Sequence, residues 1–191
     1  QALIYLDKVL QIRTQIFGEQ HIDTISTYYN IAICQEKKGA INLALSYHQK
    51  VLAMRLQTFG AMQRSVADSY LCISNIHKIK GDYRLSIECT QKAISIYFKT
   101  VGENHPNTSD AYDNLGNCYR IIANYKLALF YHQKALAIRT AVFGNIHSSI
   151  ATSYNHISIV YAGLNDCVQE IAYQQKSLDM RLKIFGEMHY N

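Results

Sequence analysis

Five glycines recur at a fixed interval along the whole chain. They are Gly18, Gly60, Gly102, Gly144 and Gly186, and each lies 42 residues after the one before it. A lysine stands ten residues before every one of them. A histidine stands three residues after four of them, and glutamine takes that place in the other unit. Several columns kept at one period indicate a tandem repeat of a single supersecondary unit.

Each unit divides into two amphipathic helix patterns. In the best-formed unit, apolar or small residues first follow the spacing of one helical face, at Tyr112, Leu115, Gly116 and Tyr119. A second stripe runs from Tyr125 to Leu136 and ends before Gly144, where a left-handed helix cap favours glycine. The pattern therefore predicts a helix hairpin in every unit.

Small residues also recur in fixed columns, which allows the two helices of a hairpin to approach closely. These columns are Ala32, Ser74, Gly116 and Ser158 in the first helix, and Ala44, Ser86 and Ala128 in the second. One hairpin cannot bury its stripe alone, so we expect stacked hairpins in an all-α solenoid. Its full units are 18–59, 60–101, 102–143 and 144–185, with a second helix at 1–17 and the start of a further repeat at 186–191.

Composition narrows the class of partner. Nineteen Lys and Arg against 14 Asp and Glu give a net charge of +5, without the basic stripe that is typical of nucleic-acid binders. The five cysteines are odd in number and form no CxxC pair, which favours free thiols and a cytoplasmic location. No apolar run approaches the roughly 20 residues of a membrane span, so no membrane partner is expected.

The hairpin residues resemble the tetratricopeptide repeat. Leu115-Gly116-x-x-Tyr119, Tyr125-x-x-Ala128-Leu129 and Ala135-Leu136 match its pattern. The 42-residue period and the linker from Gly102 to Pro106 are similar to the kinesin light chain variety, and so is the arginine that recurs at Arg13, Arg55, Arg139 and Arg181. The resemblance covers the whole chain and implies a right-handed superhelical solenoid of antiparallel hairpins.

The resemblance also implies a concave groove, lined by the first helix of each hairpin, that holds a partner peptide or helix as part of a larger protein. The groove residues carried over by alignment are Tyr29, Ile33, Lys37, Asp68, Leu71, Asn75, Lys78, Asp110, Asp113, Asn117, Arg120 and Asn155. They share a face offset from the packing stripe, and their chemistry varies between units. Asn75 and Asn117 stand one unit apart, where their amides are able to bond a peptide backbone.

The remaining features predict no catalytic, cofactor or metal site. The histidines His21, His105, His147 and His189 recur at full periods, so they do not converge on one point as zinc ligands must. We expect a structural role for them, and a core position for His48 and His132. The lysine column predicts a solvated ridge on the convex side.

Two alternatives to peptide binding remain open. The apolar stripe of the helix at 2–16 indicates a structural spacer or end-to-end self-association, because uncapped solenoid ends are sticky. Helical-repeat arrays also include RNA binders, although the low basic content counts against that function here.

Overall fold

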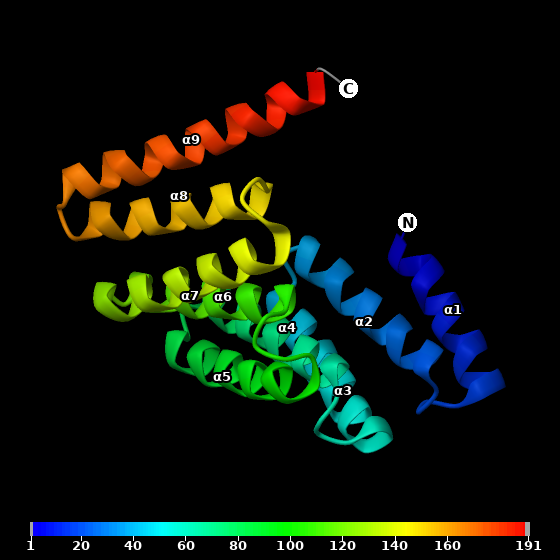
Figure 1. The fold of residues 1–191 in the computed structure, drawn as a ribbon. Helices are drawn as coiled ribbons and strands as arrows, with labels where there is room; N and C mark the ends of the chain where they lie inside the picture. The colour runs from blue at the N-terminus through cyan, green and yellow to red at the C-terminus, as the bar shows by residue number, and fades with distance from the viewer. Residues whose placement is uncertain (1, 190–191) are drawn as a thin grey trace. The chain divides into compact units, whose positions relative to one another are not determined.

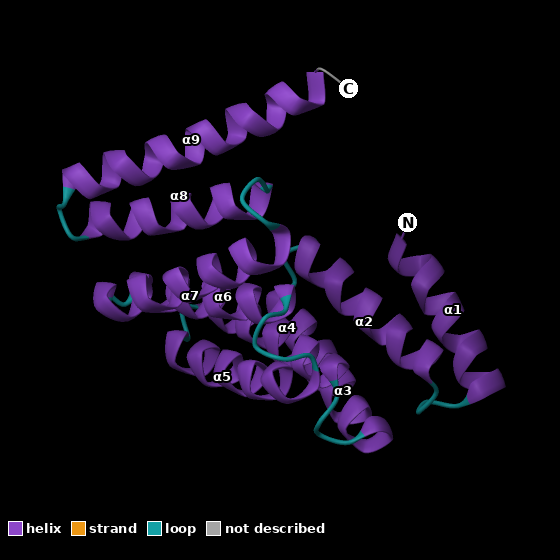
Figure 2. Cartoon of the chain, in the orientation of Figure 1, coloured by secondary structure: helices purple, strands orange, loops and turns teal. Residues whose placement is uncertain are grey.

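The computed structural model describes residues 2–189, with side chains up to residue 186. These residues form nine α-helices: α1 (Ala2–Phe17), α2 (Ile22–Lys37), α3 (Ile41–Phe59), α4 (Arg64–Lys80), α5 (Tyr83–Thr100), α6 (Pro106–Ile121), α7 (Tyr125–Phe143), α8 (Ser148–Gly163) and α9 (Cys167–His189). Helices fill nearly all of the described chain, and short turns join them (Figure 2). The predicted all-helical array of consecutive hairpins is confirmed. None of the described helices is long and apolar enough to cross a membrane.

The chain forms two compact units, which are larger than the 42-residue repeats. The first unit is Gln1–Ile96, the second unit is Tyr97–Asn191, and the boundary between them lies within α5. In the first unit, α2 and α3 form a hairpin, α1 packs on α2, and α4 packs on α3 (Figure 1). Ile25 and Tyr28 of α2 and Val51 and Met54 of α3 make its buried cluster. Apolar stripes from the two hairpin helices therefore meet, as the 3.6-residue periodicity requires.

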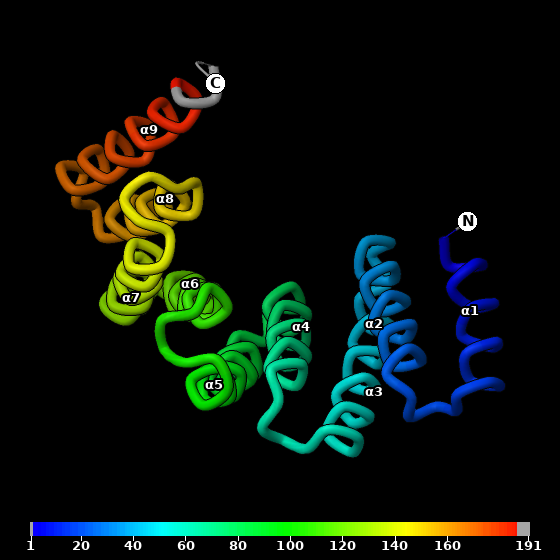
Figure 3. The backbone as a smooth tube through the Cα atoms, turned by 45° about the vertical axis from the view of Figure 1, so that its right-hand side comes forward, coloured from blue at the N-terminus to red at the C-terminus, as the bar shows by residue number. Residues whose placement is uncertain are grey.

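In the second unit, α6 pairs with α7 and α8 pairs with α9, and α8 also packs on α7 and α6 (Figure 3). The columns of small residues allow close helix packing, as predicted. Gly116 lies against the ring of His132, and a Cβ added at Gly116 would meet that ring at 2.8 Å. The close approach of α6 and α7 therefore depends on the missing side chain.

Glycine ends the helices at four positions of the 42-residue column. Gly18, Gly60, Gly102 and Gly144 have φ values between 74° and 90°, a region that is open to glycine and strained for other residues. Gly186 differs, because α9 continues through it to His189. The helix stop that the column predicts at Gly186 is not formed, and the assignment of 186–191 to a further repeat stays a prediction.

The histidine column caps the first helices. His21, His105 and His147 are the N-cap residues of α2, α6 and α8, and each Nδ1 accepts a hydrogen bond from the backbone N–H two residues later. Side-chain acceptors at this position satisfy a helix N–H that has no partner within the helix. The expected structural role is confirmed for these three, while the side chain of His189 lies outside the described residues.

Candidate functional site

The predicted groove residues of the first unit lie on α2 and α4. They are Tyr29, Ile33 and Lys37 on α2, and Asp68, Leu71, Asn75 and Lys78 on α4. Lys37 is exposed and the others are half-buried, so none of the seven belongs to the fully buried core. Within α4, Nζ of Lys78 donates to Oδ1 of Asn75 at 3.2 Å. That contact orients the Asn75 amide and leaves its nitrogen as a donor.

Tyr29 has a packing role as well as a surface position. Its ring meets His48 edge-on at 5.8 Å, and the guanidinium of Arg55 lies 5.1 Å from its centre. The Cys72 thiol of α4 donates to its hydroxyl at 3.7 Å. Burial is the main cause that raises the pKa of Tyr29 to about 12. The phenol is therefore neutral at physiological pH and joins three helices of the first unit.

The second unit holds the remaining predicted residues on α6 and α8. Asn117, Arg120 and Asn155 are half-buried, and Asp110 is exposed. Asp113 departs from the prediction, because it is only 5% exposed and lies in the interior between α6, α7 and α8. The helical wheel puts Asp113 on the same face as the other predicted groove residues, but α8 packs over this position and buries it. Asp113 therefore does not present its carboxylate to an open groove.

Asp113 is the centre of a buried polar cluster. Its Oδ1 lies 2.7 Å from Nδ1 of His132, and its Oδ2 contacts Nη1 of Arg139 and lies 3.3 Å from Nδ1 of His156. Burial by itself raises the pKa of Asp113, but hydrogen bonds from the two histidines and the charge of Arg139 outweigh it and hold the pKa well below its usual range. Burial lowers the pKa of His132. The neutral ring therefore donates its Nδ1–H to a charged carboxylate.

Asp113, His132 and His156 bring three potential metal ligands within 4.8 Å of one another. The sequence reasoning missed this convergence because the three residues belong to different columns of the repeat. Arg139 already neutralises the carboxylate, and a second cation beside the same group would be repelled by the guanidinium. We therefore interpret the cluster as a buried ion pair that fixes α6, α7 and α8 together, which supports the prediction of a core position for His132.

The arginine column joins successive hairpins, a role that sequence reasoning missed. In three of its four arginines, Nη1 donates to a hydroxyl 14 positions further along, on the first helix of the next hairpin. The pairs are Arg13 with Thr27, Arg55 with Ser69, and Arg139 with Ser153, at 2.9, 2.8 and 2.7 Å. The signal in the sequence is the constant spacing between an arginine and a serine or threonine.

The lysine column is solvated as predicted at Lys8, Lys92 and Lys176, which are exposed, while Lys50 and Lys134 are half-buried. Lys50 of α3 lies 4.0 Å from the ring centre of Tyr28 on α2, and its Nζ donates to the Tyr28 hydroxyl at 2.8 Å. Lys134 takes the same position over Tyr112, at 5.2 Å. The lysines therefore pack across the two helices of a hairpin through cation–π contacts.

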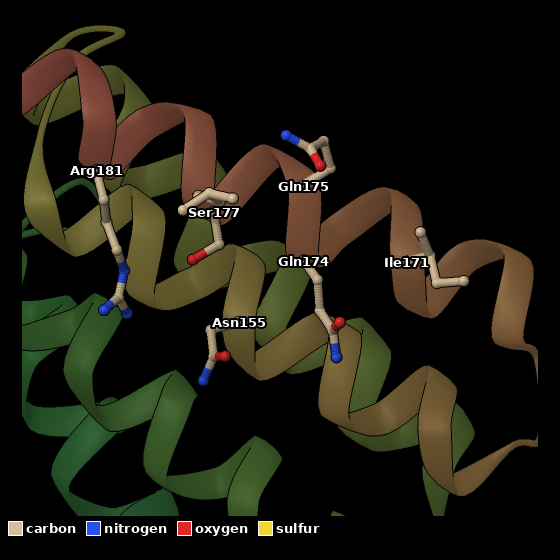
Figure 4. Close-up of a pocket in the computed structure, with 7 residues that line it drawn as sticks. Asn155, Ile171, Gln174, Gln175, Ser177 and Arg181 are labelled. Carbon is tan, nitrogen blue, oxygen red and sulfur yellow. The ribbon is translucent and has the colours of Figure 1, made fainter.

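A cavity of about 440 Å³ lies between α8 and α9 in the second unit. Asn155 and Gln174 point into it together with Arg181 (Figure 4). The positions that correspond to these three in the preceding hairpin are Asp113, His132 and Arg139, which α8 covers. The cavity therefore lies on the same surface of the repeat as the buried Asp113 cluster. In the Asp113 hairpin α8 covers this surface, whereas no described helix covers it between α8 and α9. Of the predicted groove residues, Asn155 alone lines it.

Comparison with known proteins agrees with this architecture. A tetratricopeptide repeat model matches residues 1–57 and 65–141, and a second tetratricopeptide repeat model matches residues 150–191. No curated protein matches the chain significantly.

Several solved structures share the fold. The chain is similar to BtubC (BKLC) from P. vanneervenii, with a TM-score of 0.85 and 19% identity over 95% of this chain and 72% of that one. It is also similar to a Podospora anserina putative kinesin light chain with nearly identical TPR-like repeats, with a TM-score of 0.79 and 16% identity over 96% and 87%. The apo form of RapI gives a TM-score of 0.79 and 15% identity over 95% of this chain and 48% of that one.

The family models cover most of the chain, and the described residues form consecutive helix hairpins. Scaffolds of this kind are typically non-catalytic. The chain therefore belongs to the tetratricopeptide repeat family, whose arrays generally serve as protein–protein interaction modules.

Proposed function

We propose that the chain binds a partner peptide on the outward faces of its first helices, within a larger protein. Half-buried polar residues on these helices support the proposal, above all Asn75 with its amide oriented by Lys78. A half-buried amide offers both a donor and an acceptor to a peptide backbone. Asn117 occupies the corresponding position in the second unit and is half-buried too.

The test begins with selection of a binding peptide from a displayed library on the intact chain. The affinity of that peptide is then measured by fluorescence polarisation for N75A, N117A and the double variant. Each amide hydrogen bond contributes about 1 kcal/mol, so we expect roughly fivefold weaker binding per substitution.

A matched control is N42A, which removes an exposed asparagine from the second helix α3. It should leave the affinity unchanged, and circular dichroism should show intact helices in all variants. Unchanged affinity of the double variant would exclude these two faces as the binding surface.

Self-association is a second candidate function, supported by exposed apolar residues on two helices. On α1, Tyr5 is 68% and Ile16 is 66% exposed, and on α9, Val168 is 76% exposed. Tyr5 and Ile16 are 11 residues apart and so lie on one face of α1, and an exposed apolar face often marks an interaction site. Light scattering over a concentration series decides between the candidates: concentration-dependent growth in mass that I16E abolishes supports self-association, and a constant monomer mass excludes it for this chain.

A further inference from the structure

Arg55 in the first unit has hydrogen-bond donors that none of the described residues accepts. Its Nη1 donates to the carbonyl of Ser65 at 2.7 Å and to Oγ of Ser69 at 2.8 Å. A guanidinium carries five N–H donors. Among the side chains described, those of residues 2–186, Arg55 forms no salt bridge, and its Nη2 and Nε hydrogens meet no acceptor.

The second unit shows which residues accept hydrogen bonds from the corresponding arginine. Arg139 holds the position that corresponds to Arg55, and its Nη2 donates to Oδ1 of Asp110 at 2.7 Å. In the first unit, Ser26 stands in place of Asp110, and its hydroxyl donates back to the carbonyl of Ile22. Arg139 contacts two carboxylates of its own hairpin, those of Asp110 and Asp113, and both are missing beside Arg55, where Ser26 and Tyr29 hold the corresponding positions.

A cavity of about 280 Å³ lies beside Ser26, where a carboxylate equivalent to that of Asp110 would be. Its walls include Ile22, Ile25, Ser26, Arg55, Phe59 and Gln63. Gln63 is the exception in the histidine column and makes no side-chain cap to α4. At the corresponding place in the second unit, the ring of His147 stacks on Phe143 with centres 4.1 Å apart. Glutamine has no ring to stack on Phe59, so this end of the cavity lacks the cover that histidine gives.

The same kind of cavity recurs in the second unit at a hairpin that also lacks the aspartate. Thr152 takes the place of Ser26 there, and Arg181 and Phe185 take the places of Arg55 and Phe59, around a volume of about 270 Å³. Both cavities thus lie beside an arginine whose hairpin supplies no carboxylate.

From these contacts we infer that the cavity beside Arg55 binds the carboxylate of an aspartate or glutamate side chain in a partner peptide. A planar guanidinium suits a carboxylate through two parallel hydrogen bonds, and the apolar walls suit the methylene carbons of the same side chain. The inference rests on the proposed function, since the carboxylate is taken to belong to a bound peptide. It places an acidic side chain of the bound peptide, here called the acidic anchor, next to Ser26 at the end of the outward face of α2.

The first test supplies the carboxylate from within the chain. S26D places a carboxylate where Asp110 lies in the other hairpin, and S26N is the isosteric uncharged control. We expect NMR titration to give the introduced carboxyl a pKa about 1 unit below that of an unfolded peptide, because of the nearby guanidinium. The melting temperature of S26D should also be higher than that of S26N at pH 7, where the carboxyl is charged. At pH 3 the two melting temperatures should be equal. An ordinary pKa together with equal melting temperatures at pH 7 would overturn the inference.

The second test adds the carboxylate from outside. The probes are acetyl-Leu-Asp-Leu-amide, its asparagine counterpart and sodium acetate, and the readout is the Nε–H resonance of Arg55. We expect saturable shifts with the aspartate peptide, at least threefold weaker binding of acetate, no response to the asparagine peptide, and no response of S26D to any probe. Equal binding of the two peptides, or of acetate and the aspartate peptide, would overturn it.

Failure of this inference is distinguishable from failure of the proposed function. The S26D titration needs no partner, whereas the N75A and N117A measurements use a selected peptide. Loss of affinity in the asparagine variants with an ordinary pKa in S26D would remove the acidic anchor and keep the groove. A depressed pKa with unchanged affinity in the asparagine variants would keep the carboxylate pocket and remove the asparagine faces.

Discussion

The carboxylate of Asp113 on α6 lies 2.7 Å from Nδ1 of His132 on α7, and both side chains are almost fully buried. Arg139 contacts the other carboxylate oxygen and also donates to Ser153 of α8. One acidic residue therefore links the two helices of its hairpin to the first helix of the next. The stability of the second unit should depend strongly on it.

Removing the Asp113 charge should destabilise the chain. D113N keeps the shape but leaves the buried Arg139 with only the exposed Asp110 as its counter-charge, and loss of a buried ion-pair partner typically costs about 3 kcal/mol. Urea unfolding measures the change. The control is D110N, whose side chain is 63% exposed and whose ion pair with Arg139 should contribute less than about 1 kcal/mol. Similar losses in the two variants would contradict a special role for the buried carboxylate.

Acid should destabilise the protein in two stages. The pKa of His132 is lowered by burial, so its contribution is present above its unfolded pKa of about 6.5 and is lost as pH falls below that value. The pKa of Asp113 is lowered as well, so its contribution is lost as pH falls below about 4. Melting temperatures between pH 8 and pH 3 measure both stages.

Variants separate the two stages. H132Q should remove the first and D113N the second; glutamine is a natural choice because Gln174 holds the corresponding position in the next hairpin. A melting curve with the same pH dependence in H132Q and the unmodified chain would show that another group titrates.

Gly116 should not tolerate alanine while His132 is present. The added Cβ would lie 2.8 Å from a ring that Asp113 holds in place, and such overpacking costs about 1–3 kcal/mol. H132T should relieve the cost, since Thr90 is the residue at that position in the second repeat and leaves room for Ser74 beside it. Denaturant unfolding of G116A and of G116A with H132T measures the rescue. Equal stability of these two variants would mean that the ring is not the obstacle.

Restoring the histidine column should stabilise the first unit. Gln63 has φ −130° and ψ 140°, close to the −126° and 142° of the capping His105, so Q63H fits the same backbone. A cap bond to the backbone N–H two residues later should add about 1 kcal/mol. Thermal unfolding of Q63H measures the gain, and H21A is the reciprocal variant, which should lose a similar amount.

The sequence by itself determined the repeat, the hairpins and the role of most structural columns. A glycine at a fixed period ends a helix wherever it occurs, and an amphipathic stripe has to be buried, so both effects act locally and can be seen in the order of residues. Small residues such as Gly116 likewise indicated close helix packing. The exception is Gly186, where the local signal for a helix end is present and α9 continues through it.

Only the tertiary structure decided which side chains of a helical face meet a neighbour. Asp113 and Asn155 hold the same position in the repeat, yet α8 covers the first, and the second lines an open cavity. Periodicity describes one helix at a time, whereas burial, the pKa of Asp113 and the unused donors of Arg55 depend on residues 14 to 43 positions away. Those contacts form only when the two helices of a hairpin pair and successive hairpins stack, because these steps bring residues of different columns together.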